Sequence, residues 1–128
     1  KLLLRSQHLP VCCAITHDQN GQLLNTNADT IAASLAKGLS KFFEVSLFYC
    51  FEMPGVLKKI EDKESVIGEI TPKSYTELKN NNVIHSGMIP KIENCFEALK
   101  KGVSEVKIGS PQMISGESKY TKLFLDDE

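Results

Sequence analysis

The sequence predicts an α/β domain with a largely parallel β-sheet. Short apolar runs rich in β-branched and aromatic residues alternate with stretches in which apolar residues recur every three or four positions. This alternation is typical of strands connected by helices in one layered domain. The chain has 128 residues, which suits a single domain over residues 1–128. Ligands of such sheets bind at the carboxyl ends of the strands, so strand ends and helix starts are where a site is expected.

Two strands and a helix are predicted at the beginning of the chain. Residues 10–16 (PVCCAIT) are short, apolar and β-prone, and Asn20-Gly21 is a strong turn signal, so two strands should meet around that turn. From residue 28 to residue 40, apolar residues recur at intervals of four, which predicts a helix. Asn27 is its expected N-cap, and Asp29 would then lie in its first turn.

The middle of the chain predicts a buried strand, a break and a second helix. Residues 44–51 (EVSLFYCF) form an apolar, aromatic-rich run typical of a buried strand, and Pro54-Gly55 ends it. Residues 65–70 (SVIGEI) predict another strand or extended segment. Thr71-Pro72 is typical of an N-cap followed by proline at the first helical position, and a short helix to about residue 80 is expected.

The last third of the chain predicts one more helix and two more strands. Residues 88–101 place their apolar residues on one side of a helix, which Gly102 ends. Residues 103–108 are a good strand candidate. Residues 120–125 could add a strand, which we expect at the edge of the sheet.

Composition narrows the functions that the chain can serve. Fifteen Lys and Arg residues against sixteen Asp and Glu residues give a net charge of −1, which argues against a general nucleic-acid binder. The apolar runs are shorter than the ~20 residues of a membrane helix, and residues 1–10 lack a signal-peptide pattern, so we expect a cytoplasmic protein. The four cysteines form no Cys-x-x-Cys pair, which disfavours a metal site and predicts buried, reduced thiols.

The segment from Asn25 to Asp29 (NTNAD) is the first candidate site. Alternate residues of an extended segment share a face, so Asn25 and Asn27 would point to the same side. Helix capping alone explains Asn27 and Asp29, because an asparagine accepts backbone N–H bonds and an aspartate complements the helix dipole. Capping does not explain Asn25, so a capping motif and a ligand-binding site both remain open interpretations.

The segment from Gly87 to Lys91 (GMIPK) is the second candidate site. A lysine in the first turn of a helix is unfavourable by about 0.3–1 kcal/mol, because the helix N-terminus already carries partial positive charge. A bound anion would reverse the sign of that effect, and Gly87 would let the anion approach the exposed N–H groups closely. A solvated surface lysine is the alternative interpretation.

Two further features are weaker candidates. The turn from Phe51 to Leu57 (FEMPGVL) directly follows a buried strand, a place that suits a nucleotide, although Pro-Gly is also ordinary turn chemistry. His85 lies just before the second candidate site, and a lone loop histidine is more often incidental than catalytic. The sequence contains neither a Gly-x-x-x-x-Gly-Lys-Ser/Thr loop nor a Gly-x-Gly-x-x-Gly fingerprint.

Together these segments resemble the amino acid kinase superfamily and, within it, the acetylglutamate kinases. The matching stretches are LPVCCAITHDQNGQLLNTNADTIAASLAKGL, FEMPGVL and VIHSGMIPKIENCFEALKKGVSEVKI, which span about residues 9–108. The Asn-x-Asn-Ala-Asp and Gly-Met-Ile-Pro-Lys motifs, in this order and spacing, are specific to that family. The Tyr-Cys-Phe-Glu strand end is similar to Bacteroidetes-type members, some of which prefer a succinylated substrate. The resemblance implies a three-layer α/β sandwich with a mainly parallel sheet, of which this chain would be the C-terminal, nucleotide-binding half.

The resemblance also implies an activity in arginine biosynthesis. ATP would donate its phosphoryl group to the side-chain carboxylate of N-acetyl-L-glutamate or its succinyl analogue, with Mg²⁺ carried on the nucleotide and no metal held by the protein. In the family the lysine of Gly-Met-Ile-Pro-Lys stabilises the transferring phosphoryl group, a role that falls on Lys91. The aspartate of the other motif, here Asp29, holds the catalytic lysines in place. The first asparagine of that motif, here Asn25, contacts the acylglutamate.

The nucleotide-binding residues that the resemblance implies come from two segments and one glycine. They are Glu52, Met53, Pro54, Gly55, Val56, Leu57, Val83, Ile84, His85 and Gly87. Family members are longer and often form homo-oligomers, and their N-terminal half supplies another essential lysine and further acylglutamate contacts that this sequence does not show. We therefore expect the chain by itself to be inactive. A non-catalytic nucleotide-binding or regulatory remnant is the alternative.

Overall fold

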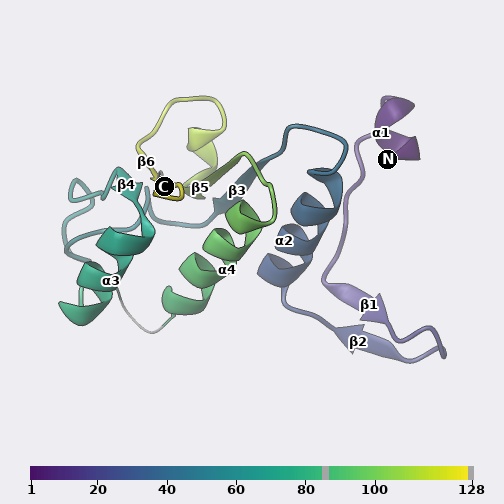
Figure 1. Ribbon diagram of the computed structural model, residues 1–128, viewed down its shortest axis with the longest axis horizontal. Coiled ribbons are helices and arrows are strands. Elements are labelled where there is room, and N and C mark those ends of the chain that lie inside the picture. The colour runs from purple at the N-terminus through teal and green to yellow at the C-terminus, as the bar shows by residue number, and fades with distance from the viewer. Residues whose placement is uncertain (85–86, 127–128) are drawn as a thin grey trace.

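The computed structural model describes residues 1–84 and 87–126. These residues form a four-stranded sheet, three helices of at least nine residues that lie side by side, and a two-stranded hairpin that projects to one side (Figure 1). Strands and helices are interspersed along the chain, although β1 and β2, β3 and β4, and α3 and α4 follow one another directly. The predicted α/β class is confirmed.

The β-hairpin and the first long helix follow the sequence pattern. β1 (Ile15–His17) and β2 (Leu23–Asn25) pair antiparallel, which confirms the turn predicted between them. The strand predicted from residue 10 is shorter than expected, because regular pairing begins only at Ile15. α2 (Ala28–Leu39) follows, and the side chain of Asn27 accepts the backbone N–H of Thr30 at 3.1 Å, so the predicted N-cap is confirmed.

The sheet is mixed and mostly parallel. Its strand order is β3-β5-β6-β4, in which β3 pairs parallel with β5, β4 pairs parallel with β6, and β5 pairs antiparallel with β6. The strand predicted at the edge is β6, and that position was wrong: β6 has hydrogen-bonded neighbours on both sides, because the short β4 covers it. The bounds of the strands are Ser46–Cys50 for β3, Glu69–Ile70 for β4, Glu105–Gly109 for β5 and Tyr120–Leu123 for β6.

Local signals set the ends of the next two helices. α3 (Pro72–Asn80) begins with a capping box, in which Thr71 and Ser74 each bond the other's backbone N–H. α4 (Ile89–Lys100) ends before Gly102, whose φ of 93° is a left-handed conformation that glycine adopts without strain. Among the described residues, no helix has the length and apolar character needed to cross a bilayer. The remaining helices are single turns, α1 (Leu2–Arg5) and η1 (Pro111–Met113).

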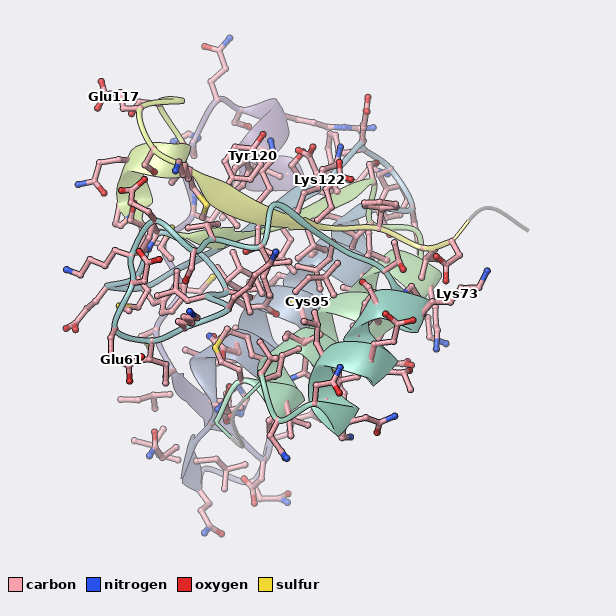
Figure 2. All side chains as sticks on the ribbon, turned by 90° about the vertical axis from the view of Figure 1, so that its left-hand side faces the viewer. Glu61, Lys73, Cys95, Glu117, Tyr120 and Lys122 are labelled. Carbon is pink, nitrogen blue, oxygen red and sulfur yellow. The ribbon has the colours of Figure 1, made fainter. Side chains whose placement is uncertain are left out.

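The core lies between the sheet and the helices. Alternate strand residues such as Val106 and Ile108 are fully buried, and they pack in one cluster with Ile92 and Cys95 of α4. Figure 2 shows Cys95 on this inner side, whereas Tyr120 and Lys122 lie on the opposite side of the sheet. That opposite side is polar and partly buried, with Glu105 paired to Lys107 at 3.0 Å and to Lys122 at 3.3 Å.

The cysteines differ from the sequence-based expectation. All four are free thiols, but only Cys95 is buried, whereas Cys12, Cys13 and Cys50 are exposed. The prediction of buried thiols was therefore wrong for three of them. Cys12 and Cys13 precede the first strand and do not join the core, and Cys50 ends β3 with its side chain at the surface.

Candidate active site

The two residues predicted to be catalytic form an ion pair. Nζ of Lys91 donates to Oδ2 of Asp29 across 2.6 Å, although 62 residues separate them along the chain. The two side chains are partly buried, with 19% and 32% of their surfaces exposed. Water screens such a pair less than a pair on open surface, so its attraction is stronger. The structure brings the two candidate segments together.

Both partners lie in the first turn of a helix, and the two helices pack side by side (Figure 1). The α2 terminus is satisfied by the Asn27 cap and by the negative charge of Asp29. The α4 terminus differs, because Met88 supplies no capping bond and the first turn holds no acidic residue. Lys91 therefore adds its charge to a helix end that is already positive. This arrangement suits an anion bound at the start of α4.

An apolar pocket of about 470 Å³ lies next to this helix start. Seven of the ten predicted nucleotide-binding residues line it, six from the two predicted segments together with Gly87. Three lining residues were absent from that predicted set. The predicted residues that line the pocket are Met53, Gly55, Val56, Leu57, Val83, Ile84 and Gly87, and the additional ones are Phe51, Ile60 and Met88.

The sequence offered a signal for two of the three additional lining residues but not for the third. Phe51 is the first residue of the predicted turn and Met88 is part of the Gly-Met-Ile-Pro-Lys motif, so each is adjacent to a residue of the predicted nucleotide-binding set. Ile60 carries no sequence signal, because it is an exposed residue of an irregular loop that reaches the pocket only through the fold.

The remaining predicted nucleotide contacts lie elsewhere. Glu52 and Pro54 line a separate, more polar pocket of about 370 Å³ with Lys63, Ser110 and other residues. They do not line the apolar pocket. His85 lies outside the described residues.

Asn25 occupies the last position of β2, where it is exposed and pairs with Ile15 of β1. It is two residues before the α2 cap, and it lines neither pocket described above. Asn25 therefore lies on the surface of the projecting hairpin, close to the beginning of α2.

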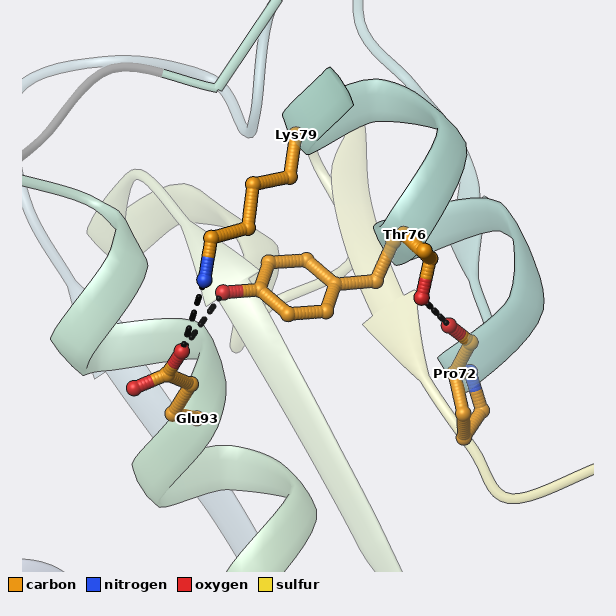
Figure 3. A network of polar contacts seen from close by, with 5 residues as sticks. Pro72, Thr76, Lys79 and Glu93 are labelled. Atoms are coloured by element: carbon orange, nitrogen blue, oxygen red, sulfur yellow. Dashed lines mark hydrogen bonds and ion pairs between the residues drawn. The ribbon is translucent and has the colours of Figure 1, made fainter.

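A polar network joins α3 to α4 (Figure 3), and its side chains do not line the apolar pocket. Oε1 of Glu93 accepts the hydroxyl of Tyr75 at 3.0 Å and Nζ of Lys79 at 3.3 Å. Burial and, after it, the neighbouring Glu93 carboxylate raise the pKa of Tyr75 to about 12. In a separate contact, the backbone N–H of Val83 donates to the backbone carbonyl of Leu78 at 2.9 Å. The end of α3 thus sets the position of Val83, which lines the apolar pocket.

Within residues 1–84 and 87–126, no group of three or more His, Cys, Asp or Glu side chains could hold a metal ion. Asp29 is already paired with Lys91, so its carboxylate is engaged in the ion pair. The described part of the site therefore offers positive charge and apolar surface.

Comparison with known proteins places this geometry in a family. The family model described as "Amino acid kinase family" matches residues 1–110. An acetylglutamate kinase from Cytophaga hutchinsonii is 54% identical over 106 residues, which are 83% of this chain and 40% of that protein. The chain thus spans about two fifths of the length of that relative.

Solved structures share the fold at low sequence identity. N-acetylglutamate synthase from Neisseria gonorrhoeae, complexed with coenzyme A and L-arginine, superposes with a TM-score of 0.73 at 18% identity, covering 96% of this chain and 29% of that one. Carbamate kinase from Giardia lamblia, bound to AMP-PNP, superposes with a TM-score of 0.60 at 16% identity, covering 88% and 41%. Because the family model matches residues 1–110, which are most of this chain, the chain belongs to the amino acid kinase family.

Proposed function

We propose that this chain is the nucleotide-binding part of an acetylglutamate kinase, an enzyme of arginine biosynthesis that acts in the cytoplasm. The proposed reaction transfers a phosphoryl group from ATP to the side-chain carboxylate of N-acetyl-L-glutamate. The identity of 54% to an acetylglutamate kinase supports this reaction class. The observation that carries the proposal is the Lys91–Asp29 ion pair at the start of α4, beside the apolar pocket.

The chemistry of the proposed substrates explains why positive charge is needed. A glutamate carboxylate has an ordinary pKa of about 4.3, so it is ionised at neutral pH and requires no general base. The obstacle is repulsion between that anion and the phosphate chain. Catalysis therefore depends on positioning and on groups that neutralise charge developing on the transferring phosphoryl group.

Lys91 is the residue of this chain proposed to supply that charge. Its ammonium lies in the first turn of α4, where the helix dipole adds partial positive charge. Asp29 keeps the ammonium at this place, and it also offsets the repulsion between Lys91 and the helix end before the substrates bind. The pair thus accounts for a lysine at a position that is unfavourable without an anion.

The apolar pocket is proposed to bind the base of ATP. Its lining consists almost entirely of aliphatic, aromatic and methionine side chains with two glycines, which suits a flat heterocycle. Gly87 and Met88 connect the pocket to the start of α4, so a nucleotide held there would direct its phosphates toward Lys91. Mg²⁺ would accompany the phosphates.

Asn25 is proposed to contact the acylglutamate, and further contacts are proposed to come from residues outside this chain. The relatives are longer than the chain, and the exposed position of Asn25 at the end of β2 leaves its amide accessible to a substrate or to another segment. An N-succinyl substrate would use the same carboxylate chemistry.

Calorimetric titration with ATP and Mg²⁺ tests the nucleotide site. Lys91→Ala should weaken binding about tenfold, because it removes a charge-assisted contact to phosphate. Lys100→Ala is the matched control, since Lys100 lies in the last turn of α4, at the other end of the helix, and pairs with the exposed Glu97 at 3.6 Å. Equal affinity of wild type and Lys91→Ala would contradict the proposed role of Lys91.

Turnover distinguishes the kinase from a non-catalytic nucleotide-binding remnant. Acylglutamate-dependent ADP release should be measured for this chain and for the longer protein that contains it. The chain alone should release little ADP, and the longer protein should turn over and lose about 10²-fold in kcat on Lys91→Ala. A longer protein that binds ATP without acylglutamate-dependent turnover would favour the remnant.

A further inference from the structure

Tyr49 contacts both members of the Lys91–Asp29 pair. Its hydroxyl donates to the backbone carbonyl of Asp29 at 3.0 Å, and Nζ of Lys91 lies 5.0 Å from the centroid of its ring. The side chain is buried, with 4% of the residue exposed. Tyr49 belongs to neither candidate motif, and the proposed phosphoryl transfer assigns it no role.

The strand geometry explains why Tyr49 reaches this place. Side chains of a strand alternate between its faces, and along β3 Leu47 and Tyr49 are buried while Phe48 lies on the other face. β3 contacts α2, and α2 packs against α4. Tyr49 is therefore at the junction where one strand and two helix starts meet.

The two contacts act on different partners. The hydrogen bond holds the backbone of Asp29, and with it the first turn of α2. The ring presents its negative face to the ammonium of Lys91, an attraction that uses none of the three N–H donors of that lysine. Those donors stay available for Asp29 and for an anion.

We infer that Tyr49 is a positioning residue that fixes both Lys91 and Asp29 for phosphoryl transfer. The inference rests on the proposed function. When Lys91 shares its donors with a phosphate, its bond to Asp29 weakens, and the ring then keeps the ammonium at the start of α4. The hydroxyl keeps Asp29 from moving away with its helix turn.

Burial keeps the hydroxyl in the form that this role needs. The pKa of Tyr49 is raised above its ordinary value, first by burial and then by the nearby Cys95 and Asp29. The hydroxyl therefore stays protonated, and remains a donor to Asp29, throughout the neutral and mildly alkaline range.

Tyr75 provides a matched control. Its hydroxyl donates to the side-chain carboxylate of Glu93 at 3.0 Å, and the ammonium of Lys79 lies 5.6 Å from the centroid of its ring. Its contacts join α3 to α4 and do not touch Lys91 or Asp29. Loss of its hydroxyl should therefore affect stability without changing the catalytic step.

Steady-state kinetics of the protein that contains this chain test the inference. Tyr49→Phe removes the hydroxyl and keeps the ring, and it should lower kcat about three- to tenfold while KM for ATP changes less than about twofold. Tyr49→Leu removes both contacts and should lower kcat further. Tyr75→Phe should keep the wild-type kcat, and Lys91→Ala serves as the reference for loss of catalysis.

The proton spectrum of Lys91 gives a second, independent readout. A side chain over an aromatic face is shifted upfield by the ring current, so the ε-methylene protons of Lys91 should be upfield in the wild type and in Tyr49→Phe. In Tyr49→Leu they should return to the ordinary lysine position. The resonance is assigned by its absence in Lys91→Ala.

The outcomes separate this inference from the proposed function. Wild-type kcat in both Tyr49 variants, together with loss of activity in Lys91→Ala, would overturn the inference alone. Wild-type kcat in Lys91→Ala would overturn the proposed role of Lys91. Equal losses in Tyr49→Phe and Tyr75→Phe would also overturn the inference, because they would show a general effect of packing. If Tyr49→Leu does not fold, Tyr49→Phe decides.

Discussion

The hydroxyl oxygen of Thr121 accepts the backbone N–H of Val56 at 2.8 Å, and so joins β6 to the turn that lines the apolar pocket. Thr121 is fully buried. A Cβ atom at the preceding Gly55 would lie 2.8 Å from that same oxygen and 2.8 Å from Cγ1 of Val66. One side of the proposed nucleotide site thus depends on a close approach between the turn and β6.

Gly55→Ala should destabilise the protein by about 1–3 kcal/mol, because the added methyl group needs space that Thr121 and Val66 already fill. The change in free energy of unfolding is measured by urea titration. Gly68→Ala is the control, since a Cβ at that exposed position would have, among the described residues other than its chain neighbours, no atom within 4 Å. Equal stability of the two variants would contradict the close packing at Gly55.

Thr121→Val should destabilise the protein by about 1–3 kcal/mol, although the two side chains have nearly the same shape. The variant leaves the buried N–H of Val56 without its acceptor. Thr76→Val is the control, because the exposed hydroxyl of Thr76 donates to the backbone carbonyl of Pro72 on the surface of α3, and its loss should cost no more than about 0.5 kcal/mol. A Thr121 variant as stable as this control would show that water replaces the lost acceptor.

A double-mutant cycle measures the Lys91–Asp29 interaction. Asp29→Asn, Lys91→Met and the double variant should give a coupling free energy of about 1–2 kcal/mol, because both side chains are partly shielded from water. The same cycle on Glu97 and Lys100, which are 56% and 58% exposed, should give no more than about 0.5 kcal/mol. Equal coupling in both cycles would mean that burial does not strengthen the first pair.

Glu105 should make stability depend on acid pH. Its hydrogen bond from Lys107 is the main cause of a lowered pKa, with burial acting in the opposite direction and Lys122 adding to the lowering. A carboxyl whose pKa is lower in the folded state stabilises the protein above its ordinary value of 4.5, and this contribution is lost as the pH falls through the lowered pKa. The difference in unfolding free energy between wild type and Glu105→Gln should therefore be present at neutral pH and shrink below 4.5.

The control for this pH dependence is Glu97→Gln. Glu97 is exposed and pairs with the equally exposed Lys100, so its removal should change stability little at any pH. If the difference in unfolding free energy between wild type and Glu105→Gln stays the same in acid, the stabilisation does not come from the ionised carboxylate of Glu105.

The four thiols should differ in reactivity. Cys12, Cys13 and Cys50 are exposed and should react with iodoacetamide in the native protein. Cys95 should react only after unfolding, because it is buried and burial raises its pKa to about 12, which leaves almost no thiolate. Mass spectrometry of the alkylated peptides gives the result, and early labelling of Cys95 would show that α4 opens in the native state.

Much of the local structure could be predicted from the sequence, because the signals for it are local. Asn27 and Thr71 cap helices by bonding residues three positions later, and Gly102 ends α4 through its own backbone conformation. The place of β6 could not be predicted in the same way. An apolar alternation shows that a segment is a strand, but it does not show which strands lie beside it.

The same distinction applies to the candidate site. The residue types and their spacing identified Lys91 and Asp29 as charged residues in the first turns of two helices, since each assignment needs only a few neighbouring residues. Their 2.6 Å contact, the buried Tyr49 that touches both and the contribution of Ile60 to the pocket were decided by tertiary structure. These contacts join segments tens of residues apart, and only the packing of α2 and α4 on the sheet determines which side chains meet.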